Sequence, residues 1–157
     1  MASLSRVEGL FVQNLVDHPI LDWVKTKRRG SFADIDNNEY PIVLIEPIMS
    51  VEEIKQLSGR KVRVVQDSIS MLVVAATKGL GNDDFVEGVV GEKTILDLAS
   101  DVRSAVYDRW CLGPSGTAAI VTELSEIRYT RAEPDGVSIL AFTCLIKTEA
   151  ETINTSV

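Results

Sequence analysis

A glycine-rich stretch with a lysine is the first place in this sequence where chemistry could be expected. It reads Gly88-Val-Val-Gly91-Glu92-Lys93-Thr94. A phosphate-binding P-loop needs four residues between its glycines and has the second glycine directly before the lysine. Here only two residues separate the glycines and Glu92 intervenes, so the spacing does not predict a nucleotide site. Gly113-Pro-Ser-Gly116 is also unsuitable, because Pro114 lacks the amide that an anion-binding loop would use.

The other residue types that catalyse reactions or bind metals have no evident partners. His18 is the only histidine and precedes Pro19 near an expected helix boundary, which favours a capping role. A catalytic base normally works with a nucleophile or an orienting group. No Cys and His group has metal-ligand spacing, and Cys111 and Cys144 lie among apolar residues, as buried free thiols do. We therefore expect no enzymatic activity, no cofactor and no metal.

A basic run near the N-terminus is the sharpest charge feature of the chain. It contains Lys25, Lys27, Arg28 and Arg29. We expect this run to end a short helix, where cations meet the negative end of the helix dipole. Its functional interpretation is contact with an acidic partner surface or with DNA.

A second candidate contact region is the glycine-rich, acidic loop expected over residues 78–93. It carries Asp83, Asp84 and Phe85 between glycines. A connection of this length is either functional or mobile, because most connections in compact domains are much shorter. We expect it to be mobile in the free protein and ordered by a partner, with hydrogen exchange that slows on assembly.

Composition restricts the class of protein. At 157 residues and 45% hydrophobic content, the chain suits one ordinary globular domain. Its net charge of −7 gives no counterion-release energy on DNA or RNA, so general nucleic-acid binding is not expected. The N-terminal residues lack the apolar core of a signal peptide, and no run approaches a membrane span. We expect no membrane contact and a place in the cytoplasm or in an assembly formed there.

Apolar spacing predicts three helices. The first covers about residues 5–17, with Ser5 and Glu8 as a capping box. A short one begins at Pro19 and ends in the basic run. The longest covers 94–110, with an apolar stripe at helical spacing. The stripe consists of Ile95, Leu98, Val102, Ala105 and Val106, with Ala99 beside it.

The middle of the chain indicates strands. A short buried strand is expected over 42–45 between Pro41 and Pro47, followed by a short helical turn from Ser50 to about residue 57. Residues 61–77 are expected to be extended, with a turn or bulge at Asp67-Ser68.

Residues 118–148 are typical of a hairpin around the turn Glu133-Pro-Asp-Gly136. Its second strand is apolar on both faces, because side chains alternate along a strand. One face carries Val137, Ile139, Ala141 and Leu145, and the other carries Leu140, Phe142, Cys144 and Ile146. A strand of this kind needs cover on both sides. We expect the long helix to cover the Phe142 face and a neighbouring subunit to cover Ile139, Ala141 and Leu145.

The order of elements predicts an α+β fold: one mixed or antiparallel sheet, with the long helix and the N-terminal helices packed on one face. We expect a single domain over residues 1–147, in which 1–30 form the N-terminal helices and 40–147 form the sheet and long helix. Residues 148–157 are expected to be a polar, frayed tail.

Three segments together carry a family pattern. They are Tyr40-Pro-Ile-Val-Leu-Ile-Glu-Pro47, Thr94-Ile-Leu-Asp-Leu-Ala-Ser-Asp-Val-Arg-Ser-Ala105 and the strand start Gly136-Val-Ser-Ile-Leu-Ala-Phe142. In this order, with a glycine-rich acidic loop between the first two, residues 40–147 resemble the tail terminator (tail completion) proteins of Mu-like contractile-tailed bacteriophages. The N-terminal region is longer than that pattern, which leaves open another neck or connector protein of the same particle.

The resemblance implies a structural virion protein that forms a ring, usually six-fold, at the head-proximal end of the tail. Its implied partners are further copies of itself, the tail tube, the sheath protein and the head–tail connector, with DNA only as cargo passing through the lumen. Two alternatives from other classes remain open. One is a small oligomeric enzyme with a site between subunits, and the other is a monomeric adaptor or ligand-binding domain.

Overall fold

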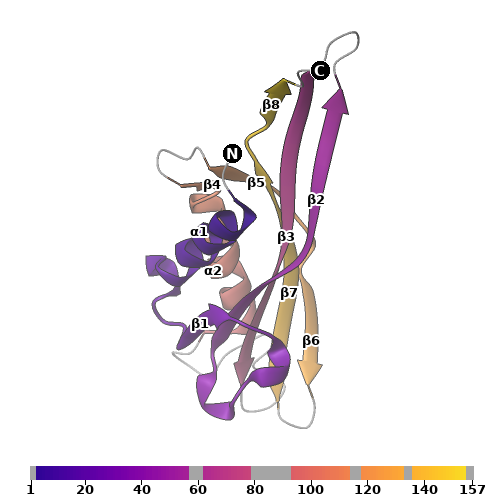
Figure 1. The fold of residues 1–157 in the computed structure, drawn as a ribbon. Helices are drawn as coiled ribbons and strands as arrows, with labels where there is room; N and C mark the ends of the chain where they lie inside the picture. Colours follow the sequence, from indigo (N-terminus) through magenta and orange to yellow (C-terminus); the bar gives the residue numbers. More distant parts are fainter. Residues whose placement is uncertain (1–2, 57–61, 79–92, 114–117, 133–135, 155–157) are drawn as a thin grey trace.

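The computed structural model describes residues 3–56, 62–78, 93–113, 118–132 and 136–154. These residues form one eight-stranded, mixed sheet with two α-helices (Figure 1). The predicted α+β class is therefore confirmed. The elements are α1 (Leu4–Val16), η1 (Pro19–Leu21), β1 (Thr26–Arg29), η2 (Phe32–Asp34), η3 (Asn37–Glu39), β2 (Ile42–Gln56), β3 (Val62–Lys78), α2 (Ile95–Asp108), β4 (Cys111–Leu112), β5 (Ala119–Leu124), β6 (Arg128–Ala132), β7 (Val137–Thr148) and β8 (Glu151–Asn154).

The sheet is centred on the long strands β2, β3 and β7. Its strand order is β1-β2-β3-β7-β5-β4, while β6 also pairs with β7 and β8 also pairs with β3. Among the strands of the described residues, β1 and β2 pair in parallel and the other pairs are antiparallel. Figure 1 shows α1 and α2 beside one another on the same side of the sheet.

Helix α1 lies close to its predicted position but is capped differently. Ser3, not Ser5, is the N-cap, and its hydroxyl accepts a hydrogen bond of 3.2 Å from the amide of Arg6. Glu8 pairs with Arg29 instead of closing a capping box. The helix begins earlier than predicted because the serine two residues upstream supplies the cap.

The basic run does not end a helix. The helix expected from Pro19 is only the 3₁₀ turn η1, and residues Thr26–Arg29 form β1. This strand pairs in parallel with Ile42–Ile45 of β2. The helix prediction for this segment was wrong because the pairing partner lies more than a dozen residues away, where local spacing gives no signal.

Strand β2 is much longer than the predicted 42–45. It continues through Pro47 to Gln56 with one register shift between Pro47 and Met49, so the predicted helical turn after Ser50 is wrong. Proline is tolerated at an edge strand, where no neighbour needs its missing amide. Strand β3 also runs without a break through Asp67-Ser68, where a turn was expected.

The long helix and the hairpin follow the sequence signals closely. Helix α2 starts at a capping box in which Thr94 Oγ1 accepts from the amide of Asp97 and the Asp97 carboxylate accepts from the amide of Thr94. Its entire predicted stripe is buried. The hairpin is present between β6 and β7, with Ala132 opposite Val137, and Gly136 has a φ of 64°. Turn residues 133–135 lie outside the described residues.

Two further sequence-based expectations need correction. The first arm of the hairpin is split into β5 and β6, which pair with different halves of β7. Residues expected as a frayed tail include Thr148, which is 2% exposed, and β8, which pairs with Val62–Val65 of β3.

The described residues form two hydrophobic clusters, on opposite faces of β7. The main one joins Leu140, Phe142, Cys144 and Ile146 to the apolar stripes of both helices. The smaller one contains Ile42, Leu44, Ala76 and Val137, with Phe32, Ile35 and Ile139 packed against it. The second face of β7 is therefore covered at one end by the chain itself, through the segment that carries η2 and η3. The expectation that this face has no cover within the chain is wrong there, since Phe32 and Ile35 supply apolar contacts from an otherwise polar loop.

Candidate functional site

The basic run is largely used in contacts within the chain. Lys27 Nζ donates to the carbonyl of Leu21 at 3.1 Å. Arg29 makes a two-point ion pair with Glu8 at 2.5 and 3.0 Å. The hydrogen bond and charge of Glu8 raise the pKa of Arg29. Lys25 is exposed.

Arg28 makes the corresponding contact on the other side of β1. It donates from Nε and Nη2 to the Glu39 carboxylate at 3.3 and 3.2 Å. The Arg28 hydrogen bond, together with the amide of Asp36, holds the pKa of Glu39 below its ordinary value. These bonds hold β1 between α1 and the η3 turn. The guanidinium groups of Arg28 and Arg29 are therefore engaged within the fold, and a partner would have to compete with Glu39 and Glu8 for them.

The candidates in the glycine-rich loop, Asp83, Asp84 and Phe85, lie outside the described residues, as does the loop over 79–92. Lys93 at its end is described. Lys93 Nζ lies 2.9 Å from Asp101 Oδ2 and 4.8 Å from the centre of the Trp23 ring. Trp23 Nε1 also donates to Asp101 at 2.8 Å. Lys93 therefore ties the start of α2 to the N-terminal region.

His18 and Cys144, two residue types that could do chemistry, have structural roles in the described part of the chain. His18 caps η1: its Nδ1 accepts from the amide of Ile20 at 3.2 Å. Nε2 is left to donate to Asp108 at 2.7 Å, so the predicted capping role of His18 is confirmed. Burial raises the pKa of the Cys144 thiol to about 12, which makes it a poor nucleophile. Among the described side chains, no group of three or more His, Cys, Asp or Glu could hold a metal ion.

The three β7 candidates share one face, as predicted, but their surroundings differ. Ile139, Ala141 and Leu145 are each partly exposed, while the alternate residues of β7 are buried. Ile139 packs against the smaller cluster. Leu145 lies farther along the strand, directly opposite Ser70 of β3 and Glu123 of β5. The open part of this face is therefore the half around Ala141 and Leu145.

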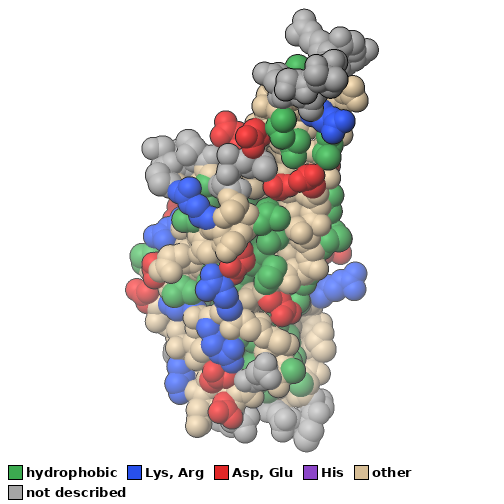
Figure 2. All heavy atoms as spheres, viewed as in Figure 1, with side chains coloured by type: hydrophobic (Ala, Val, Ile, Leu, Met, Phe, Trp, Pro, Cys, Tyr) green, Lys and Arg blue, Asp and Glu red, His purple; other side chains and the backbone are tan. Residues whose placement is uncertain are grey.

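A projecting arm is the feature that the sequence did not predict. Beyond the helices, β2 and β3 continue together toward the top of Figure 1, with β8 along the other side of β3. Every β2 residue from Pro47 to Gln56 is exposed. Its large apolar side chains are Ile48 (52% exposed), Met49 (59%), Val51 (44%) and Ile54 (54%). Figure 2 shows hydrophobic and acidic side chains mixed along this arm. The alternation of apolar Met49 and Val51 with polar Ser50 and Glu52 was the available signal, but Pro47 and the Ser50–Glu53 spacing favoured other structures.

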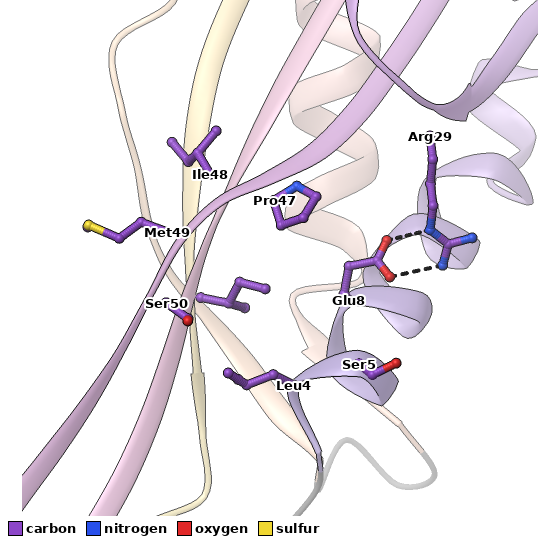
Figure 3. A pocket seen from close by; sticks show the side chains of 9 residues that line it. Leu4, Ser5, Glu8, Arg29, Pro47, Ile48, Met49 and Ser50 are labelled. Carbon is purple, nitrogen blue, oxygen red and sulfur yellow. Dashed lines mark hydrogen bonds and ion pairs between the residues drawn. The ribbon is translucent and has the colours of Figure 1, made fainter.

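An open groove of about 600 Å³ lies where the arm leaves the body of the protein. Leu4 and the start of α1 form one wall and β2 forms the other, with Ile48 and Met49 beside it (Figure 3). The Glu8–Arg29 ion pair closes one end. The groove is lined by Leu4, Ser5, Glu8, Arg29, Pro47, Ile48, Met49, Ser50 and Ile69. Glu8 and Arg29 pair with each other, and the other lining side chains are apolar apart from the hydroxyl groups of Ser5 and Ser50.

The comparisons with known proteins add no family. No protein-family model matches the chain, and no curated protein matches its sequence. Among the described residues, no helix is long and apolar enough to cross a membrane.

Proposed function

We propose that this chain is a structural protein of a phage tail, forming a ring at the head-proximal end of the tail tube. The observation that carries the proposal is the arm, in which ten consecutive β2 residues from Pro47 to Gln56 are exposed, four of them large and apolar. Leaving these four side chains in water forgoes the free energy of their burial, so the arm is a candidate interaction surface. The family resemblance of residues 40–147 supplies the kind of assembly.

In the proposed ring, α1 and α2 act as one helical layer packed on one face of the sheet. The open half of the other β7 face, around Ala141 and Leu145, meets the neighbouring subunit. Contacts between two different surfaces of identical subunits close into a ring when the rotation allows. The ring ends tube polymerisation and offers the surface that joins the head connector.

The charge of the chain agrees with this role. A net charge of −7 suits a channel through which DNA slides without sticking, because like charges repel. A neighbouring neck protein of the same particle would share these requirements. The proposed place of the protein is therefore the neck region of the virion, assembled in the host cytoplasm, with tail tube, sheath and connector as partners.

Removal of the gene tests the role directly. If the ring stops tube polymerisation, particles made without it are expected to have tails of uncontrolled length and heads that are not joined to tails. Electron microscopy of the lysate measures both. Supplying the gene from a plasmid should restore tails of one length, and tails of normal length on joined particles without the gene would contradict the proposal.

A further inference from the structure

The tip of the arm is a three-stranded sheet with one outer edge on β2. Here β3 pairs with β2 on one side, placing Val65 opposite Ile54 and Val64 opposite Lys55, and with β8 on the other. Among the described residues, no strand pairs with β2 beyond Ile45 on the side away from β3. This outer edge therefore presents backbone donors and acceptors that another strand could use.

The sequence of this edge is complementary to itself. It reads Glu52-Glu53-Ile54-Lys55-Gln56. If two copies pair in antiparallel fashion about a two-fold axis at Ile54, Glu53 of each lies directly opposite Lys55 of the other. The same register places each Glu52 opposite Gln56 and brings the two Ile54 side chains together. Directly opposite residues share a face of the sheet, and Glu53 and Lys55 do share one because they are two positions apart.

Neighbouring registers lack this complementarity. An axis at Glu53 would set the two Glu53 carboxylates against each other, and an axis at Glu52 would do the same with Glu52. Like charges directly opposite destabilise a strand pair. An axis between two residues is excluded, because it would set side chains of opposite faces against each other.

We infer that the protein self-associates through this edge, with two arms pairing antiparallel about Ile54 to form one continuous sheet. The occupant of the edge is thus a second copy of the same chain. The contact is two-fold and uses the same surface on both copies, so it links subunits in pairs and cannot close a ring of six. It shares with the proposed ring only the observation that the arm is exposed. The ring contact is placed on the open half of the β7 face, around Ala141 and Leu145, so each contact can fail without the other.

The strength expected of the contact is modest. The described pairing covers the five residues 52–56, far less than a standard protein interface. A Kd of about 10⁻⁵ to 10⁻³ M is therefore expected for the free chain. Within an assembly that holds many arms side by side, the same contact would be strengthened by multivalency.

Cysteine substitution tests the register. Opposite Cα atoms in an antiparallel pair lie about 4.5–5.5 Å apart, within the range that a disulfide spans. Ile54→Cys should therefore give a covalent dimer under mild oxidation, in a background with Cys111→Ser. Glu52→Cys alone should not, because its own image lies about 14 Å along the strand. A mixture of Glu52→Cys and Gln56→Cys chains should again cross-link. Equal cross-linking at 52 and 54, or none at 54, would overturn the inference.

Charge exchange tests the energetics without cysteines. Glu53→Lys alone should raise the dimer Kd by about tenfold or more, because both symmetric pairs become repulsive. Adding Lys55→Glu to it should restore association. Glu126→Lys, in the connection between β5 and β6, makes the same change in net charge and should have no effect.

Sedimentation over a concentration series measures all four proteins. A wild-type chain that stays monomeric at every concentration would overturn the inference. That result is expected if the charges of the edge only prevent pairing, or if the edge binds a strand of another protein. If the charge-exchange variants change the dimer Kd as expected but no rings are seen on tail tubes, the dimer is supported and the ring proposal is contradicted. If rings form on tail tubes but the arms do not dimerise, the ring is supported and the dimer is contradicted.

Discussion

Leu140→Glu is expected to abolish folding of the chain. Leu140 is fully buried in the main cluster, between Ala75 of β3 and Tyr129 of β6. Burying an unpaired carboxylate costs several kcal/mol, comparable with a domain's whole stability of about 5–15 kcal/mol. Circular dichroism should show no cooperative melting transition. The milder Leu140→Ala should lower the free energy of unfolding by about 2–5 kcal/mol and keep a transition.

Leu140 is a sharper site for this test than Phe142, although both face the main cluster. The Arg103 guanidinium lies 5.3 Å from the centre of the Phe142 ring. A carboxylate at position 142 could therefore gain a cationic partner, and its charge would no longer be unpaired. A Leu140→Glu chain that melts cooperatively near the wild-type temperature would show that the helices do not seal this face of β7.

Leu145→Lys is expected to leave the subunit folded and to block assembly of the ring. Leu145 is partly exposed, and Glu123 directly opposite can accept the new charge, so the change should cost the subunit less than about 1 kcal/mol. At a closed contact between subunits, the same lysine would be buried without a designed partner. Thermal melts measure the first effect, and a count of tail tubes that carry a ring measures the second.

Leu96→Lys is the matched control, since Leu96 is an exposed leucine on α2 (45%). It should fold and assemble. Ring formation by Leu145→Lys at the wild-type level would show that the open face of β7 is only solvent-exposed. Ile139, which is on the same face, is a less clean probe, because it packs against the smaller cluster and a charge there would also destabilise the subunit.

The parts of the fold that sequence predicted correctly are those fixed by local signals. Helix α2 has its stripe at helical spacing and its cap beside it, and both are present. The β6–β7 hairpin has its turn signal between two short segments, so its pairing partners are adjacent in the chain. In each case the residues that decide the structure lie within a few positions of one another.

The parts that sequence missed depend on distant partners. The Thr26–Arg29 segment is a strand only because Ile42–Ile45 lies beside it, and Pro47 is accommodated only because that position faces an open edge. The two faces of β7 were correctly assigned, since alternation is local. The cover of the second face was not predicted. Phe32 and Ile35 pack there from a loop that is otherwise polar, and the polar residues gave no indication of this packing.

The candidate contact residues were also difficult to interpret from sequence, because their partners are distant in the chain. The charges of Arg28 and Arg29 were visible in the sequence, but their partners Glu39 and Glu8 lie on separate elements. The arm was missed because Pro47 and the Ser50–Glu53 spacing indicated the end of a strand and a helical turn, whereas β2 continues to Gln56.

Localisation of the chain in intact particles tests the central proposal most directly. Electron microscopy of particles labelled with an antibody against this chain should show the label as a single site at the head-proximal end of the tail. Averaged images should resolve a closed ring there. Label along the tail tube, at the distal end of the tail or on the capsid, or particles that lack the chain altogether, would contradict the account.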